Sequence, residues 1–530
     1  MKQPKTLMSI LTLFALPLML TSCEDLFGEW DKPTQQVSVS KTPGTFSFGT
    51  TSVIKGSLDP VYTNTLMLTG DGQVSYVSSN TSIATVDANG AVTFQDLAPG
   101  ASGSTTITAT ISDTETYTYA TKQISYTIQV YEGYTFRFWS DSEQKFLTDI
   151  APSAQCQLIE TSTATLDNSK IHVVKGTVNV DHDIQMTESC RFILCDNSTL
   201  NISGRLYLTS SSDDYLRIFA QSDGEEKGRL NVTASTGTDN KGVIDCKKMD
   251  IHGGIITATA ESNTIKMYGI NATATLTVYG GDIKGVGSGS DSGGGDGVRG
   301  FNSTGYHLVI HGGRVEGIGG DTTSGTNKGG TGICGKFIID GDAIVIGTGG
   351  NNLANYQGGD GIYNNTFSSA IGGNAKVTAT GGNSANSTGG NGMQAQGGVT
   401  ISDNAQVKAT GGNTSANDKK GGPGAHNGNI NLKDNASFTA AAGKSGGNQD
   451  GQEAMWSTLN YYSGTFTTIG GEKGPTGTKH GKAFSDNRLC NKSTETVTFE
   501  QSDDGETWTT FTISAGDKDS PTKRYVRKTE

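Results

Sequence analysis

An apolar position recurs through the middle of the chain about every 30 residues, the period of stacked repeat proteins. The position holds Ile256, Ile283, Val315, Val345, Val377, Val407, Phe438 and Phe466. A Gly-Gly pair follows four residues later in most of these periods. The segments between turns are short, β-branched and alternating, which indicates strands rather than helices. We therefore predict an all-β chain with a right-handed parallel β-helix (a solenoid) over 166–485, in which each period forms one coil.

Aligned periods also place small and polar residues in columns. Small residues lie two positions after the apolar one, at Gly317, Gly347, Ala379, Ala409 and Ala440. We expect both columns to face the interior, because alternate strand residues share a face. Two polar columns hold Asp321, Asn351, Asn383 and Asn413, and Asp342, Asn374, Asn404 and Asn435. Coils about 4.8 Å apart allow stacked amides to hydrogen-bond along a column, so these are either structural ladders or groups that bind sugar.

Composition narrows the class of protein. The chain has 530 residues, of which 74 are Gly and 33% are hydrophobic. This composition alone could indicate disorder, but a disordered chain has no reason to keep a valine in register. The net charge of −12 argues against nucleic-acid binding through a general positive field. The cysteines after Cys23 lack metal-ligand spacing, and we expect them to be small core residues.

The N-terminus has the pattern of a targeting segment. Lysines precede an apolar run that ends at Leu20-Thr21-Ser22-Cys23, which is typical of a signal peptide over 1–22. The four residues resemble the lipobox of bacterial lipoproteins. The resemblance implies cleavage before Cys23 and acylation of that residue, with palmitate among the acyl chains. Acyl chains would hold the mature protein at the outer membrane, and acidic Glu24-Asp25 favours the face toward the medium. We expect a flexible tether over 23–50.

The region 51–132 reads as short alternating strands. Asp87-Ala88-Asn89-Gly90 lies between two apolar strands and indicates a hairpin, because Asn-Gly accepts positive φ. The stretch from Ser78 to Thr93, with the later run Thr105 to Thr110, resembles a bacterial Ig-like module of group 2. The resemblance implies a β-sandwich that serves as a spacer or adhesive stalk.

Both ends of the solenoid are expected to carry caps, because an open coil end exposes apolar residues and strand edges. The aromatic-rich segment 133–165 is predicted as a linker and N-terminal cap, with a short helix over 142–150. The segment 486–530 is predicted as a small β cap, beneath which Trp456, Tyr461 and Tyr462 pack.

The run from Ile193 to Ser235 and the Gly-rich repeats after it resemble carbohydrate-binding β-helix domains of secreted and lipid-anchored bacterial proteins. These are relatives of pectate-lyase-type solenoids. The resemblance implies a surface-anchored protein whose partner is a polysaccharide or a host or plant glycan. We expect a monomer that binds no nucleic acid.

Candidate site residues are those that break the repeat. Aromatic rings can stack on sugars and a guanidinium can bind uronate carboxylates, so the glycan candidates are Tyr306, Tyr356, Tyr363 and Arg299. The candidate Ca²⁺ ligands are Asp296, Asp321, Asp340, Asp342 and Asp360, because Ca²⁺ takes six to eight oxygen ligands. We expect Asp340 and Asp342 on one strand, with Asp321 in the preceding coil. Asp296 and Asp360 occupy equivalent positions about 9.6 Å apart, two coil spacings, too far to share one ion directly.

Three function classes stay open at this point. The first is a non-catalytic glycan-binding protein. The second is a Ca²⁺-dependent polysaccharide lyase or hydrolase, in which Arg299 could act as a base. The third is a structural adhesin stalk. The sequence shows no Ser-His-Asp order, phosphate loop or zinc pattern.

Overall fold

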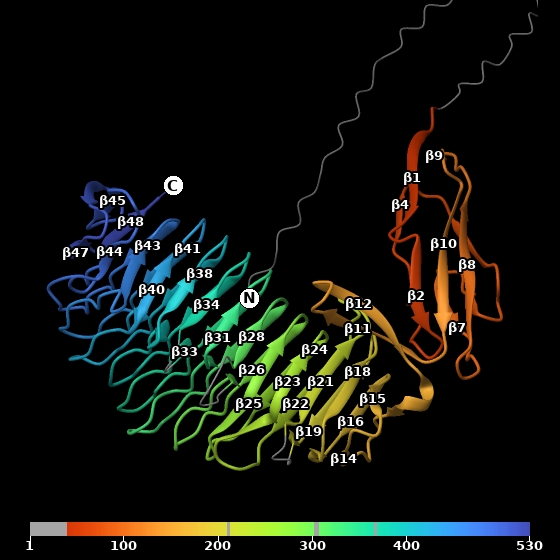
Figure 1. The fold of residues 1–530 in the computed structure, drawn as a ribbon, viewed down its shortest axis with the longest axis horizontal. Helices are drawn as coiled ribbons and strands as arrows, with labels where there is room; N and C mark the ends of the chain where they lie inside the picture. Colours follow the sequence, from red (N-terminus) through yellow and green to blue (C-terminus); the bar gives the residue numbers. More distant parts are fainter. Residues whose placement is uncertain (1–39, 209–212, 301–306, 365–367, 530) are drawn as a thin grey trace, which may run out of the picture.

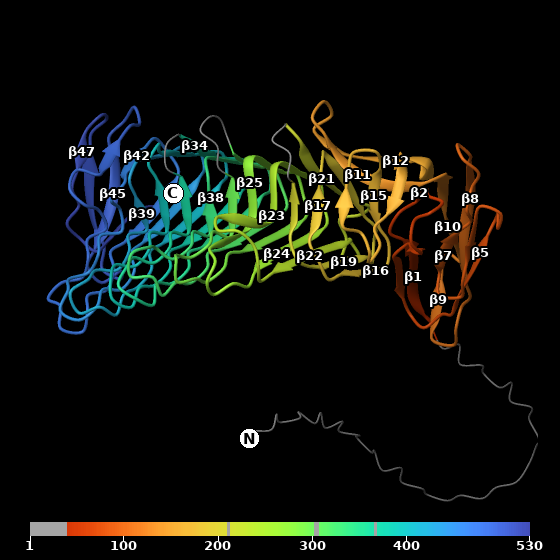
Figure 2. The same cartoon turned by 90° about the horizontal axis from the view of Figure 1, so that it is seen from below.

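The computed structural model describes residues 40–208, 213–300, 307–364 and 368–529. The regular elements of these residues are strands joined by turns and loops, apart from one 3-10 helix, η1 (Ser153–Gln155). A small sandwich adjoins the N-terminal end of a long solenoid (Figure 1), and strands β45–β48 lie at the opposite end (Figure 2). The prediction of an all-β chain with a parallel β-helix after an Ig-like region is therefore confirmed.

The Ig-like region contains three small sheets. Its strands are β1 (Thr42–Phe48), β2 (Ser52–Gly56), β3 (Tyr62–Thr63), β4 (Leu66–Thr69), β5 (Val74–Ser78), β6 (Ala84–Val86), β7 (Ala91–Phe94), β8 (Ser102–Ile111), β9 (Tyr117–Tyr119) and β10 (Gln123–Tyr131). The predicted hairpin joins β6 and β7, with Gly90 at φ 82°. Strand β1 pairs with β4 and β9, so the strands begin within the segment 23–50 that was expected to be a tether. Backbone pairing within one sheet fixes β1, Thr42–Phe48.

A hairpin of β11 (Tyr134–Ser140) and β12 (Lys145–Ala151) replaces the helix expected over 142–150, so that prediction is wrong. The pairing of Phe138 with Leu147 and of Trp139 with Phe146 outweighs the weak local helix preference. The hairpin folds back over the first coils, where Arg137 pairs with Ala220. It thus lies at the end of the solenoid at which we expected a cap.

The solenoid has three columns of parallel strands, called faces A, B and C. Face A consists of β14 (Thr165–Leu166), β17 (Ile184–Met186), β20 (Leu206–Leu208), the first parts of β23 (Lys241–Ile251) and β25 (Met267–Val278), β27 (Val298–Gly300), β30 (Ile333–Cys334), β33 (Ile362–Asn364), β36 (Met393–Ala395) and β39 (Ala425–His426). Face B consists of β13 (Cys156–Leu158), β15 (Ile171–Val174), β18 (Cys190–Leu194), β21 (Tyr215–Ala220), the second parts of β23 and β25, β28 (Leu308–Ile310), β31 (Phe337–Ile339), β34 (Ser369–Ile371), β37 (Val399–Ile401), β40 (Asn429–Leu432), β42 (Thr458–Tyr461) and β44 (Leu489–Asn491). Face C consists of β16 (Thr177–Val180), β19 (Thr199–Ser203), β22 (Arg229–Ala234), β24 (Ile255–Ala260), β26 (Asp282–Val286), β29 (Arg314–Ile318), β32 (Ile344–Thr348), β35 (Lys376–Thr380), β38 (Gln406–Thr410), β41 (Ser437–Ala441) and β43 (Thr465–Ile469).

The apolar positions that recur about every 30 residues lie on face C and pair with one another from coil to coil. Val345 pairs with Val377, which pairs with Val407, and Phe438 follows in the next coil. These side chains are buried, as are Ala379 and Ala409 two positions later. Large and small residues therefore alternate along each strand and fill the interior of the solenoid.

The polar columns form hydrogen-bonded ladders, as the structural alternative predicted. The Asn351 side chain accepts from the backbone N–H of Asn383 at 2.9 Å, and Asn383 accepts from Asn413 at 2.8 Å. In the other column, Asn404 donates from Nδ2 to the Asn374 oxygen at 3.2 Å. The Gly-rich loops that follow face C also stack, through bridges such as that between Asn352 and Ser384.

The C-terminal end is covered by antiparallel strands, namely β45 (Val497–Ser502), β46 (Thr509–Ile513), β47 (Lys518–Asp519) and β48 (Tyr525–Lys528). Strand β48 pairs with β43, the last strand of face C. Tyr461 packs against Phe499 with ring centroids 5.4 Å apart. Trp456 and Tyr462 are 42% and 40% exposed, so only Tyr461 of the three aromatic residues packs beneath the cap as expected.

Candidate functional site

The outward side of face A carries one column of side chains, one per coil. Backbone pairing aligns Asp245, Asn271, Arg299, Cys334, Tyr363, Gln394 and His426, and Trp456 follows because Met455 bridges to Ala425. The residue before each of these faces the interior, as Ile362 and Met393 do. Because successive side chains of a strand point to opposite sides, face A carries an outward row of amide, charged and aromatic side chains.

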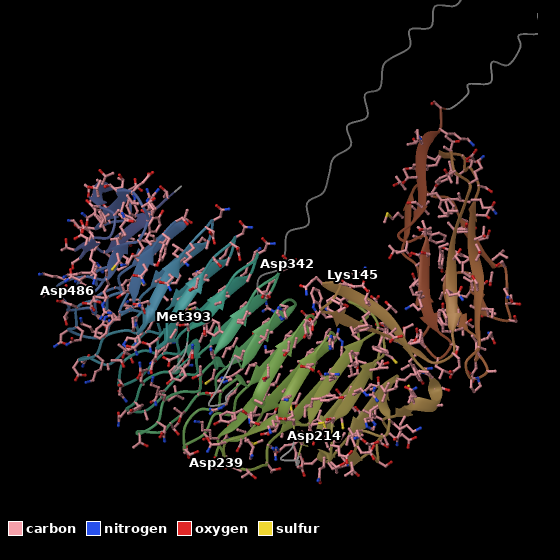
Figure 3. All side chains as sticks on the ribbon, viewed as in Figure 1. Lys145, Asp214, Asp239, Asp342, Met393 and Asp486 are labelled. Atoms are coloured by element: carbon pink, nitrogen blue, oxygen red, sulfur yellow. The ribbon has the colours of Figure 1, made fainter. Side chains whose placement is uncertain are left out.

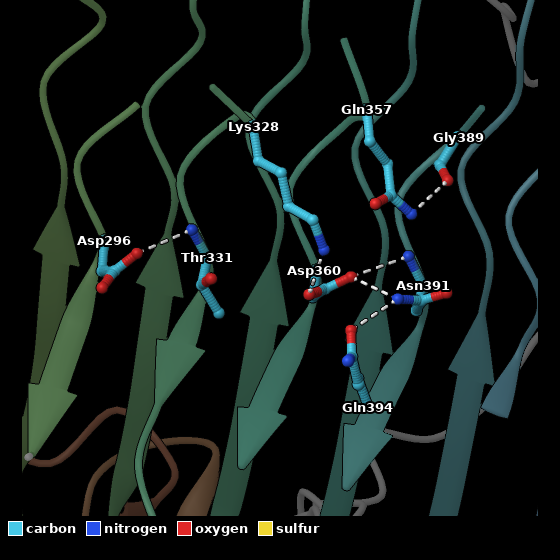
Figure 4. Close-up of polar contacts among 8 residues, drawn as sticks. All are labelled: Asp296, Lys328, Thr331, Gln357, Asp360, Gly389, Asn391 and Gln394. Carbon is cyan, nitrogen blue, oxygen red and sulfur yellow. Dashed lines mark hydrogen bonds and ion pairs between the residues drawn. The ribbon is translucent and has the colours of Figure 1, made fainter. Parts of the chain in front are cut away.

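A carboxylate organises the middle of the row. Asp360 is 2% exposed and accepts hydrogen bonds from the backbone N–H of Asn391 at 3.0 Å and from its side-chain amide at 2.7 Å. The same amide donates to the Gln394 oxygen at 2.8 Å, and Lys328 lies 3.4 Å from Asp360 (Figure 4). These bonds hold the carboxamides of Asn391 and Gln394 in fixed orientations.

A groove of about 230 Å³ lies beside this network, and its lining includes Gln394, His426 and Trp456. The rings of His426 and Trp456 are 5.6 Å apart and inclined by 34°. Ser485 stands at the Trp456 position of the next coil, because Met455 bridges to Phe484. A small residue there leaves room beside the indole, which suits stacking of an apolar or sugar-ring face.

His426 has a buried Nδ1 atom without a hydrogen-bond partner among the described residues. Burial lowers the pKa of His426, so the imidazole is neutral near pH 7. A buried polar atom without a partner is uncommon and costs free energy. Because this nitrogen is shielded from solvent, His426 contributes its ring to the groove, beside the indole of Trp456.

The predicted site residue Arg299 lies further along the same row. Its guanidinium contacts Asp296 at 3.0 Å and the Tyr268 hydroxyl at 3.1 Å, and it covers the Tyr268 ring at 4.6 Å. Burial alone would lower the pKa of Arg299, but the neighbouring Asp296 raises it above the usual value. The guanidinium stays protonated, which does not suit the role of a base in a lyase.

The five candidate Ca²⁺ ligands do not come together. Asp340 and Asp342 flank Gly341, which has φ 58°, in the turn between β31 and β32. They do not share a strand, so that expectation is wrong. Asp342 lies at the edge of the solenoid (Figure 3) and accepts a hydrogen bond from the Asn374 amide at 3.0 Å. Asp340 pairs with His311.

Asp321 lies at the far end of face C, where it accepts from the Asn351 N–H at 2.6 Å. Asp296 and Asp360 occupy equivalent positions with the coil of Thr331 between them, as predicted. Within the ranges that the structure describes, no three His, Cys, Asp or Glu side chains form a group that could hold a metal ion.

The remaining predicted residues are placed as follows. Tyr363 belongs to the face A row, between Cys334 and Gln394. Tyr356 lies in a Gly-rich loop and is 42% exposed. Tyr306 and Cys23 lie outside the described residues, as does the signal peptide 1–22. Sequence reasoning missed Gln394, His426 and Trp456 as site residues, although aligning the position after each inward residue of face A would have placed them in one row.

Comparisons with known proteins support the N-terminal assignment. The family described as "Intimin, immunoglobulin-like domain" matches residues 62–113, which include strands β3 to β8. The comparisons with curated proteins and with solved structures found no match. An Ig-like domain followed by a β-solenoid fits an adhesin-like surface protein; the finer assignment to group 2 stays a prediction. In the described part of the chain, no helix has the length and apolarity needed to span a bilayer.

Proposed function

We propose that this protein is a surface lipoprotein that binds a glycan in the face A groove, without catalysing its cleavage. The observation that carries the proposal is the exposed Trp456 ring beside the His426 ring and the fixed amides of Gln394 and Asn391. Rings that stack on sugar faces and amides that bind hydroxyls are the two contacts that recognition of a glycan needs.

We further propose that the bound stretch of glycan is uncharged. The one lysine in the groove lining, Lys328, already faces a carboxylate, 3.4 Å from Asp360, and Lys420 next to the lining residue Gly421 lies 3.7 Å from Glu453. A uronate carboxylate would have to displace a partner that belongs to the protein. A neutral or N-acetylated sugar needs no such exchange, because it offers hydroxyl and amide groups to the same surface.

The anchoring part of the proposal rests on the sequence around Cys23. Acylation there would hold the protein at the outer membrane, and the Ig-like region would stand between the anchor and the solenoid. We expect the protein to act as a monomer. Labelling with a radioactive or clickable palmitate analogue tests the anchor, since Cys23→Ser should abolish incorporation.

A glycan array probed with the mature chain tests binding. Trp456→Ala should reduce binding to any recognised neutral glycan by about five- to tenfold, because loss of one stacking contact costs roughly 1–1.5 kcal/mol. Tyr462→Ala is the matched control: this ring is 40% exposed but lies over Lys433, beyond the end of β42 on face B. Equal losses in both variants, or binding confined to uronate polymers, would contradict the proposal.

The same preparation separates binding from catalysis. Incubation with acidic plant polysaccharides and Ca²⁺, followed by absorbance of unsaturated products, detects lyase activity directly. We expect no absorbance change with the wild-type protein. Product formation would refute the non-catalytic function.

A further inference from the structure

A cleft of about 670 Å³ lies between the Ig-like region and the start of the solenoid. The Ig-like side contributes Lys55 and Tyr62, together with residues of β10 such as Gln129. The solenoid side contributes residues that follow β18 and β21, including Asp196 and Glu226. Figure 2 shows β2 and β10 beside β11 and β12 at this junction. Ligand sites occur preferentially at such domain interfaces.

The two walls of the cleft are held together by a buried hydrogen-bond network. Asp59, which follows β2, accepts from the Thr135 N–H at 2.9 Å, from the Thr135 hydroxyl at 2.6 Å and from Gln221 Nε2 at 2.5 Å. Lys175 of the solenoid donates to the Leu58 carbonyl at 2.8 Å. Asp59 is buried, so these bonds replace the water that its carboxylate would otherwise need. The cleft is therefore preformed.

Lys55 is the unusual group in the cleft. It is only 9% exposed, yet its ammonium takes part in none of the ion pairs or side-chain hydrogen bonds found among the described residues. Its ammonium lies 4.6 Å from the centroid of the Tyr62 ring, and its charge acts on the carboxylates of Asp59 and Asp196. A buried ammonium group normally has acceptors for its three N–H donors. Lys55 thus offers donors to whatever occupies the cleft.

The other charges limit what that occupant can be. Arg137 pairs with Asp223 at 2.9 Å, which leaves Lys55 facing Asp196 and Glu226. The lining has three carboxylates against two cations, so an anion would meet net negative charge. A cation would meet the unpaired ammonium of Lys55. The remaining lining is hydroxyl and amide, as in Gln129 and Ser222.

We propose that this cleft binds one uncharged sugar residue, with Lys55 donating to its hydroxyls and Asp196 and Glu226 accepting from them. The Ig-like region then forms half of a second glycan site rather than acting as a spacer alone. This site lies outside the face A groove, and none of its residues line both. The two proposals can therefore fail separately.

The test uses saturation-transfer NMR on the mature chain with glucose, galactose, N-acetylglucosamine and galacturonate, each at roughly ten millimolar, a concentration suited to weak sites. At least one neutral sugar should show transfer in the wild-type protein and in Trp456→Ala. The signal should fall about fivefold or more in Lys55→Met, as expected for loss of roughly 1 kcal/mol or more. Lys122→Met is the matched control, because Lys122 lies on the same Ig-like region in an exposed pair with Asp113.

Each other outcome overturns the proposal. No transfer from any neutral sugar, transfer only from galacturonate, or an undiminished signal in Lys55→Met would each contradict an uncharged sugar held by Lys55. Loss of the signal in Trp456→Ala alone would assign it to the face A groove. Thermal unfolding and circular dichroism check that Lys55→Met is folded. If it is not, Gln129→Ala, on the opposite wall from Asp196, serves as the variant with the same expected loss.

Discussion

Gly411→Ala should destabilise one coil of the solenoid, although it adds only a methyl group. Gly411 directly follows β38, where the Gly-rich loop leaves face C. A Cβ atom at this position would overlap the carbonyl group of Gly422, and even the next atom, the Pro423 carbonyl oxygen, would lie only 2.8 Å away. Ordinary contact is about 3.5 Å. Both obstacles are backbone atoms, which cannot move away as a flexible side chain can.

The expected magnitude follows from two opposing effects. Overpacking a rigid site costs about 1–3 kcal/mol, and a clash with backbone belongs at the upper end. Replacing Gly by Ala also restricts the unfolded chain, which stabilises the protein by about 0.4–1 kcal/mol. The net loss should be about 2 kcal/mol. It should also weaken the hydrogen bond from Gly411 N–H to the Ala441 carbonyl, which is 2.8 Å long.

Gly325→Ala is the matched control, because a Cβ atom at Gly325 meets nothing within 4 Å. It lies in an equivalent Gly-rich loop and should leave stability unchanged or raise it slightly. Hydrogen exchange followed by mass spectrometry measures both variants. Amides of 399–425 should exchange about 30-fold faster in Gly411→Ala, since each 1.4 kcal/mol is tenfold. Equal exchange in the two variants would refute the close-approach argument.

Three further predictions concern the interior and its ionisable groups. Phe438→Ala should lower the free energy of unfolding in urea by about 3–5 kcal/mol, because this ring is 1% exposed and leaves a cavity; a loss below about 1 kcal/mol would show that the coils collapse around it. Burial lowers the pKa of His252 to about 4, and its Nδ1 accepts a hydrogen bond from the backbone N–H of Trp139 at 3.0 Å. As the pH falls, the unfolded state therefore binds the proton first, so the free energy of unfolding should decrease from about pH 6.5 toward pH 4. His252→Phe should lose less of this free energy between pH 7 and 4.5 in the same urea assay. Burial raises the pKa of Cys195 and Cys246 well above the usual value, so Ellman's reagent should label them only after denaturation; rapid labelling of the native protein would contradict their burial.

The solenoid could be predicted because its packing requirements recur at a fixed spacing along the sequence. In one coil Val377 is buried, Ala379 allows close packing and Asn383 forms a ladder hydrogen bond. The equivalent positions of the neighbouring coils have the same roles. The structure confirmed these columns. The hairpin β11–β12 was mispredicted as a helix because its pairing partners come from tertiary contacts that local propensity does not contain.

The candidate site could be predicted only in part. Arg299 and Tyr363 were identified because they break the repeat, and both lie on face A. His426 and Trp456 were missed because their importance depends on which neighbours stand above and below them. Asp321 and Asp342 were grouped because we expected them in adjacent coils, whereas β29 and the turn after β31 place them at opposite ends of face C.

The sequence by itself determined the β-helix, its period, its inward columns and its polar ladders, since stacking imposes the same requirement on every coil. The tertiary structure alone decided which outward side chains share a groove and that the Ig-like region closes a cleft with the first coils. Lys55 and Glu226 lie far apart in the sequence and line the same cavity. Contacts of that kind depend on the angle between two folded units, which no local pattern encodes.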